Sequence, residues 1–336
     1  MKRIFEWLPT IVDRRVRVIA WVYLAAQILL VGTGGLVRLT SSGLGCPTWP
    51  KCTEDSLVNT PEMGINGLIE FCNRLLGVAL GILAIIAFIA VLRLRRERPN
   101  LFWLTLLAGL GIPAQALIGG ISVWTQLNPY VVGLHFVVSV ILVCLCTTFV
   151  YRVYTATGPR YRTVPRWFLG VAHLTSFVVF VTIVVGILTT GSGPHAGDAN
   201  APRNGLNPEF LQHIHSWPAY ATLALTLVLV IGSVTLRLPL RAWALLLLIV
   251  ELAQVGVGLL QSNTGLPPVL VGIHMVLAVT LGAAMMAVIL NLKAPVKSRI
   301  ASPESPTEST PDSTSESTLE STPAAAQFPS VRRPER

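Results

Sequence analysis

Residues 115–139 read QALIGGISVWTQLNPYVVGLHFVVS, and residues 254–278 read QVGVGLLQSNTGLPPVLVGIHMVLA. Each stretch places a glutamine twenty residues before a histidine, Gln115 before His135 and Gln254 before His274. Three further pairs lie in register between them: Gly119/Gly258, Pro129/Pro268 and Gly133/Gly272. An internal repeat of this kind predicts a duplicated protein with two related halves and one equivalent histidine in each.

The composition is that of a membrane protein. Of the 336 residues, 52% are hydrophobic and only 12% are charged. The chain contains eight apolar runs, at about 18–37, 68–92, 101–122, 131–150, 167–190, 210–235, 241–261 and 269–291. Each is long enough to cross a bilayer core of ~30 Å, which takes about 20 residues. No small-residue cleavage site follows the first run, so we expect it to remain as the first membrane helix.

Basic residues lie mainly in alternate loops. They precede the first run (Lys2, Arg3, Arg14, Arg15, Arg17) and follow the second (Arg93, Arg95, Arg96, Arg98), the fourth (Arg152, Arg160, Arg162, Arg166), the sixth (Arg237, Arg241) and the eighth (Lys293, Lys297, Arg299). The opposite loops carry only Arg38, Lys51 and Arg203. This pattern predicts a multi-pass protein of the cell membrane with both termini in the cytoplasm. The net charge of +9 then reports topology and contact with lipid, and predicts no nucleic-acid partner.

The repeat extends to other helices. LIEFCNRL (68–75) aligns with FLQHIHSW (210–217), so that Glu70 matches Gln212 and Asn73 matches His215. Each half then has four helices, an even number, which gives the halves the same orientation in the membrane. We therefore predict an all-α integral membrane fold of eight transmembrane helices, arranged as two tandem four-helix bundles related by a pseudo-twofold axis along the membrane normal.

Five segments follow from this organisation. They are a cytoplasmic N-terminal segment (1–17), an N-terminal half (18–150), a cytoplasmic linker (151–166), a C-terminal half (167–292) and a cytoplasmic tail (293–336). The tail is rich in Ser, Thr, Pro and Glu beyond Ile300, and it has too few large apolar residues to offset the entropy of ordering. We expect it to be disordered.

His215 and His274 are expected at the same depth in the same half. Two imidazoles that face each other across a four-helix bundle can bind a haem iron from both axial sides. The alternative is that each is only a packed, hydrogen-bonded histidine, but ionisable groups within a membrane usually mark function. Zinc or non-haem iron is disfavoured because no further Cys or carboxylate stands at that depth.

The other histidines of this half are weaker candidates. His213 is two positions from His215, about 200° around the helix, so both cannot face one iron. His173 is expected near the opposite end of its helix. His195 lies in a Gly-rich loop beside the predicted site, where both a role at the haem edge and a solvated imidazole remain open.

In the N-terminal half the histidine pair is broken. His135 matches His274, but Asn73 stands where His215 would predict a second ligand. Glu70 lies one turn from Asn73, whereas its repeat partner is a neutral glutamine. Glu70 could simply pair with Arg74 or Arg38; otherwise it stands as an acid or base beside a metal with an open coordination position.

Several motifs together resemble the haem A synthase family over roughly residues 15–295. They are GGLVRLTSSGLGCPTWPKC (34–52), EFCNR (70–74), GLH (133–135), TGSGPHAGD (190–198), HIHSW (213–217) and GIH (272–274). The family's usual motif in the second helix is E-x-x-H-R, so Asn73 is a departure that puts bis-histidine ligation in the N-terminal half in doubt.

The resemblance implies an oxidoreductase that converts haem O to haem A for cytochrome c oxidase. The C8 methyl group of the porphyrin would be hydroxylated twice, and the resulting gem-diol would lose water to give the formyl group. His215 and His274 would hold a haem b, and His135 would bind the iron of the haem O substrate. Glu70 would act near the methyl carbon, by stabilising positive charge or by moving a proton. Arg38 and Arg74 would pair with haem propionates; the alternative is that they are only interfacial arginines. Haem O synthase and cytochrome oxidase assembly proteins are the implied partners.

Cys46 and Cys52 share one short loop on the side where disulfides persist, although two free thiols remain possible. The family often has such a pair here, which implies a disulfide. Cys72, Cys144 and Cys146 lie within helices and are expected to be packing residues.

Two other functions compete with the enzyme. A non-catalytic b-type haem electron-transfer subunit would require four histidine ligands and would have no use for Glu70. A haem transporter would release haem unmodified. Asn73 and Glu70 therefore favour an enzyme.

Overall fold

The computed structural model describes residues 8–295. Its eight long helices are α2 (Arg14–Leu39), α3 (Gly64–Val91), α4 (Pro99–Trp124), α5 (Pro129–Tyr154), α6 (Arg166–Ser192), α7 (Pro208–Thr235), α8 (Arg241–Asn263) and α9 (Pro268–Leu290). Short 3₁₀ helices flank α3, η1 (Pro61–Met63) before it and η2 (Leu92–Arg95) after it. All eight long helices are long and apolar enough to cross a membrane. The predicted all-α membrane fold is confirmed, with helix ends within a few residues of those expected.

Local sequence fixes several helix starts. The Asp13 side chain accepts a hydrogen bond from the Val16 amide at the start of α2. Asn128 and Asn207 cap α5 and α7 in the same way, and each is followed by a proline at the first helical position. A polar cap satisfies an amide that has no partner within the helix, and proline there loses no hydrogen bond.

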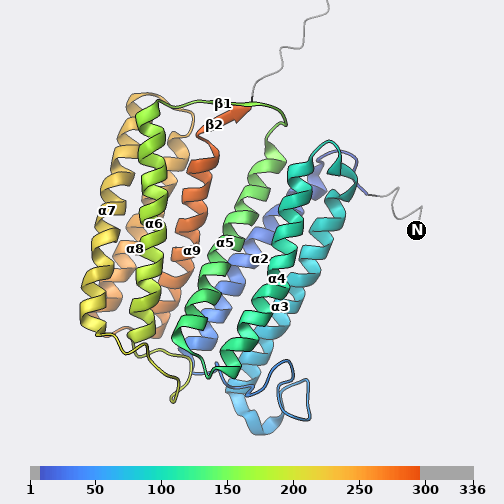
Figure 1. The fold of residues 1–336 in the computed structure, drawn as a ribbon, viewed down its shortest axis with the longest axis vertical. Helices are drawn as coiled ribbons and strands as arrows, with labels where there is room; N and C mark the ends of the chain where they lie inside the picture. The colour runs from blue at the N-terminus through green and yellow to red at the C-terminus, as the bar shows by residue number, and fades with distance from the viewer. Residues whose placement is uncertain (1–7, 296–336) are drawn as a thin grey trace, which may run out of the picture. The chain divides into compact units, whose positions relative to one another are not determined.

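Each half closes a ring of four helices. In the N-terminal half α2 packs on α3, α3 on α4, α4 on α5 and α5 on α2, and in the C-terminal half α6 to α9 pack in the same cyclic order (Figure 1). The halves meet mainly where α9 contacts α5 and α2. Phe136 and Val140 of α5 pack against both hydrophobic cores. The pseudo-twofold relation between the halves stays a prediction.

Small residues bring helices of the two halves together. A Cβ placed on Gly32 of α2 would lie 3.2 Å from Val276 of α9, and one on Gly282 of α9 would lie 3.2 Å from Val140 of α5. Close approach at such positions replaces the hydrophobic effect as the main source of helix association in lipid.

A two-stranded antiparallel sheet was not expected. β1 (Arg160–Arg162) lies in the predicted linker and pairs with β2 (Lys293–Pro295), the first residues of the predicted tail. The Arg160 guanidinium strengthens the pair by donating to the Tyr151 hydroxyl and to the Leu290 carbonyl. Residues 1–7 and 296–336, which include most of the predicted tail, lie outside the described residues.

The loops α2–α3, α4–α5, α6–α7 and α8–α9 lie together at the end of the bundle opposite the β1–β2 pair (Figure 1). We call it the disulfide end, because Cys46 and Cys52 of the α2–α3 loop form a disulfide. All the predicted site residues belong to the helix ends and loops on this side.

Candidate functional site

His215 of α7 and His274 of α9 face each other inside the C-terminal half. Their ring centroids are 6.4 Å apart, and the ring planes are 79° apart. The Nδ1 atoms of both rings are buried and have no hydrogen-bond partner within residues 8–295. The structure therefore brings together the two histidines that the sequence predicted as a pair, and leaves a buried polar atom on each unsatisfied.

Both rings rest directly on glycines of neighbouring helices. A Cβ on Gly186 of α6 would lie 2.8 Å from Cε1 of His215, and a Cβ on Gly258 of α8 would lie 3.1 Å from Cε1 of His274. A larger residue at either position would push the imidazole out of place. The two glycines set how deeply each ring sits.

The spacing of the rings suits one metal ion between them. An imidazole nitrogen binds a transition metal at ~2 Å and the ring centre lies roughly 1 Å further away, so two rings on one metal have centres about 6 Å apart. The part of the chain that the structure describes contains no cluster of three or more His, Cys, Asp or Glu residues that could hold a bare metal ion. His215 and His274 are therefore the residues of this half that could hold a metal-containing cofactor.

His135 of α5 has no such partner. Its ring contacts Gly119 of α4, where a Cβ would lie 3.4 Å from Cε1. Its Nδ1 is buried and unpaired in the described structure. The Gln115 side chain donates to the His135 carbonyl at 3.1 Å and so ties α4 to α5 next to the ring. The single histidine of this half is therefore held like those of the other half.

Asn73 is engaged elsewhere. Its Oδ1 accepts a hydrogen bond of 2.8 Å from the Thr33 hydroxyl of α2. The residue that replaces the expected histidine thus links α3 to α2.

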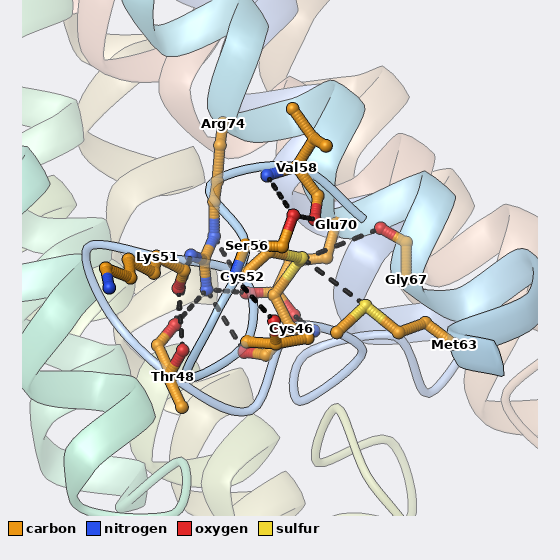
Figure 2. The surroundings of a disulfide bond; sticks show 11 residues. Cys46, Thr48, Lys51, Cys52, Ser56, Val58, Met63, Gly67, Glu70 and Arg74 are labelled. Carbon is orange, nitrogen blue, oxygen red and sulfur yellow. Dashed lines mark hydrogen bonds and ion pairs between the residues drawn. A yellow bond between two sulfur atoms is a disulfide. The ribbon is translucent and has the colours of Figure 1, made fainter. Parts of the chain in front are cut away.

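Glu70 uses both of its carboxylate oxygens. Oε1 pairs with the guanidinium of Arg74, one turn later on α3, and Oε2 accepts a 2.7 Å hydrogen bond from the Cys46 amide (Figure 2). Arg74 also donates to the carbonyls of Cys46, Thr48 and Lys51. This buried ion pair fastens the α2–α3 loop to α3, and of the two arginines considered from sequence it is Arg74 that pairs with Glu70.

The predicted disulfide is confirmed. Cys46 and Cys52 are bonded, with Cα atoms 4.5 Å apart, and both are fully buried. Their loop also packs against α4, where the Trp49 ring lies on Gly120 and stacks edge-on against Trp124. Glu70, Arg74 and the disulfide thus form one structural unit at the disulfide end of the N-terminal half.

Arg38 links the two halves. From the last turn of α2 it donates to the carbonyls of His195 (2.6 Å) and Thr190 (3.0 Å). The His195 ring in turn hydrogen-bonds through Nε2 with the Leu266 carbonyl of the α8–α9 loop at 2.9 Å. His195 is therefore held within the loops of the disulfide end. His213 and His173 are exposed.

Glu251 was missed by the sequence reasoning. It lies in the middle of α8, only 3% of its surface is exposed, and neither carboxylate oxygen has a hydrogen-bond partner among the described residues. The sequence does contain a sign of it: Glu251 is the single carboxylate in the apolar run 241–261, and the repeat matches it to Ile112 in the other half.

The fold and the site define a class: an eight-helix membrane protein with a facing histidine pair in one half and a single histidine in the other. Residues 17–286 match the cytochrome oxidase assembly protein family. The chain belongs to this family.

Its relatives include bacterial proteins named heme A synthase. The chain is 30% identical over 135 residues to the one from Geobacillus thermodenitrificans (40% of each chain) and 33% identical over 107 residues to the one from Geobacillus kaustophilus (32% of this chain, 33% of the relative). It is 36% identical over 119 residues to that of Listeria welshimeri (34% and 37%). The aligned parts span about two-fifths or less of these relatives.

Proposed function

We propose that this protein is a haem A synthase, which oxidises the C8 methyl group of haem O to the formyl group of haem A. The observation that carries the proposal is the facing pair His215 and His274, with ring centroids 6.4 Å apart and both Nδ1 atoms unpaired in the described structure. Family membership and the names of the relatives support haem O as the substrate. The haem O would come from a haem O synthase, and the product would serve cytochrome oxidase.

The C-terminal half has the features needed to hold a haem b. His215 and His274 would be its ligands, since the distance between their rings fits one iron. Close packing against Gly186 and Gly258 keeps each ring in position. When bound, a bis-histidine haem supplies one-electron transfer. The protein's part is to fix both rings and exclude water from between them.

The N-terminal half would receive haem O. His135 would bind the substrate iron, because it occupies the same helical position as His274 and presents a ring held against a glycine. Asn73 is already bonded to Thr33 and is a poor iron ligand. The position opposite His135 would thus have no protein imidazole.

Glu70 would act by its charge. Both oxygens already accept hydrogen bonds, from Arg74 and from the Cys46 amide, so taking a proton would require breaking the ion pair. A fixed carboxylate close to the reacting carbon can instead stabilise positive charge that develops there. The guanidinium groups of Arg38 and Arg74 each donate hydrogen bonds to backbone carbonyls. Guanidinium N–H groups that make no such bond would bind the haem propionates.

The membrane topology follows from the charges. With both termini in the cytoplasm of a cell-membrane protein, the disulfide end faces outward, where a disulfide persists. Haem O, which is apolar, would reach the site from the lipid.

The direct test is to extract the haems from cells that express the full chain together with a source of haem O, and to separate them by chromatography. We expect haem A only when this chain is present. His215→Ala and His274→Ala should each abolish the low-spin haem b spectrum of the purified protein. If cells with the wild-type chain contain haem O but no haem A, the proposed enzyme activity is wrong.

A further inference from the structure

Glu251 is a buried carboxyl group in the middle of a helix of the C-terminal half. It lies ten residues from the start of α8 at Arg241, so it is ~15 Å from that end of the helix. The hydroxyl of Thr226 in α7 lies beside its carboxyl group. Even so, neither Glu251 oxygen, nor the Thr226 hydroxyl, has a hydrogen-bond partner within the described residues.

No cation is placed to neutralise a charge at this position. The helices packed against α8 are α7 and α9, and these three helices contain no lysine and one arginine, Arg241, at the far end. The titratable side chains of α7 and α9 are Glu209, His213, His215, Tyr220 and His274. Burying an unpaired carboxylate costs far more free energy than burying the neutral acid, so a carboxyl group in this setting keeps its proton.

Glu251 also begins a polar stripe on one face of α8. Gln254, Gly258 and Gln261 follow it at intervals of three and four residues, which places them on the same side of the helix. The side-chain oxygens of Gln254 and Gln261 are buried, and they too have no partner in the described structure. The stripe covers ten residues, or ~15 Å, towards the disulfide end, and passes His274 at Gly258.

Buried polar groups that lack protein partners usually bind ordered water. Unpaired oxygens at Glu251, Gln254 and Gln261 can therefore anchor a short file of water molecules along α8. The N-terminal half lacks this feature, because the repeat places Ile112 at the position of Glu251 and Ser122 at that of Gln261.

We propose that Glu251 is a proton-holding site inside the membrane, and that Gln254 and Gln261 connect it through water to the disulfide end. In exchange, the O–H bond of the Glu251 carboxyl breaks as its proton passes to a neighbouring water, and a new O–H bond forms on the carboxyl with a proton returned by the water file, so that the charge is unchanged and nothing is oxidised or reduced. The site would let the C-terminal half store one proton about 10 Å along α8 from the glycine under His274. The inference rests on the described residues alone and does not depend on the proposed enzyme activity.

The first test asks whether Glu251 carries a proton. The full chain without bound haem is treated at neutral pH with dicyclohexylcarbodiimide, an apolar reagent that modifies protonated carboxyl groups, and adducts are located by peptide mass spectrometry. We expect modification at Glu251. Glu70 is a matched control: it is also buried in a membrane helix, but both of its carboxyl oxygens are already held, one by Arg74 and the other by the Cys46 amide, so we expect little modification there. A Glu251 that stays unmodified at neutral pH in the folded chain would overturn the proposal.

The second test asks whether the stripe carries the exchange. The infrared C=O band of a protonated carboxyl shifts in heavy water, and the band that disappears in Glu251→Gln but persists in Glu70→Gln belongs to Glu251. We expect that band to shift several-fold more slowly in Gln254→Leu and Gln261→Leu. Gln115→Leu, the equivalent change in the other half, should exchange at the wild-type rate. Equal rates in all variants would show that the stripe is not the path.

Discussion

Two glycines control the position of the facing histidines, and the control can be measured. In Gly186→Ala the new Cβ would lie 2.8 Å from Cε1 of His215, so the ring or α6 must shift, at a cost of about 1–3 kcal/mol. We expect a weakened low-spin haem b spectrum in the purified variant. Gly256→Ala is the control, since a Cβ there meets nothing within 4 Å. Equal haem spectra in both variants would remove Gly186 from the site.

Glu70 carries a charge that its repeat partner Gln212 does without. Glu70→Gln keeps the shape and an oxygen for the Cys46 amide but deprives Arg74 of its anion. We expect haem A formation to stop while the His215/His274 spectrum persists, with a loss of about 1–3 kcal/mol in the free energy of unfolding.

Haem chromatography and thermal unfolding measure these two effects separately. Glu62→Gln, an exposed change on the neighbouring 3₁₀ helix, is the control. Haem A at the wild-type level in Glu70→Gln would exclude Glu70 from the reaction.

Asn73→His would restore the family's usual residue. The change breaks the hydrogen bond to Thr33 and adds an imidazole at the position that the repeat matches to His215. We expect haem O bound in the N-terminal half to change from five-coordinate, or water-ligated, to six-coordinate low-spin, as seen in its optical and electron paramagnetic resonance spectra. The C-terminal haem should not change. Two low-spin haems already present in the wild-type protein would contradict our view of this half.

At the level of elements, the α2–α3 loop behaves as one unit with the start of α3. Its disulfide, its contacts with Arg74 and the packing of Trp49 on Gly120 act on the same few residues. We therefore expect Cys46 and Cys52 to resist alkylation until a reductant is added, as measured by mass spectrometry. Reduction should lower haem A formation more than it alters the haem b spectrum, because Glu70 bonds to the Cys46 amide whereas His215 lies in the other half. Labelling of both thiols without reductant would refute this.

The helices and their histidines could be predicted because their signals are local and repeated. A run of apolar residues, an Asn-Pro start and a histidine twenty residues after a glutamine are all visible in one window of sequence. The β1–β2 pair and the bonds from Arg38 to the α6–α7 loop join segments more than a hundred residues apart, so no local pattern announces them. Glu251 was not predicted for another reason: the candidate iron ligands and Glu70 came from positions that are polar in both halves, and the repeat matches Glu251 to the apolar Ile112.

At the scale of the whole bundle, the two halves of the described structure carry different buried polar groups. The C-terminal half pairs two imidazoles and adds a lone carboxyl group in α8, while the N-terminal half pairs a carboxylate with arginine beneath a disulfide. On the predicted repeat, the differences at Asn73, Glu70 and Glu251 separate the two halves. Gly119 and Gly258 are a feature that the two halves share, since each packs against the histidine of the next helix.

The contact between α2 and α9 sets an order for biosynthesis. A ribosome makes α2 well before α9, yet Gly32 and Gly35 of α2 lie against Val276 and Met275 of α9. Until translation reaches α9, this face of α2 can be covered only by lipid or a chaperone. Chains that stop before α9 should therefore be recognised as incomplete and degraded, even though every residue of the N-terminal half has already been made.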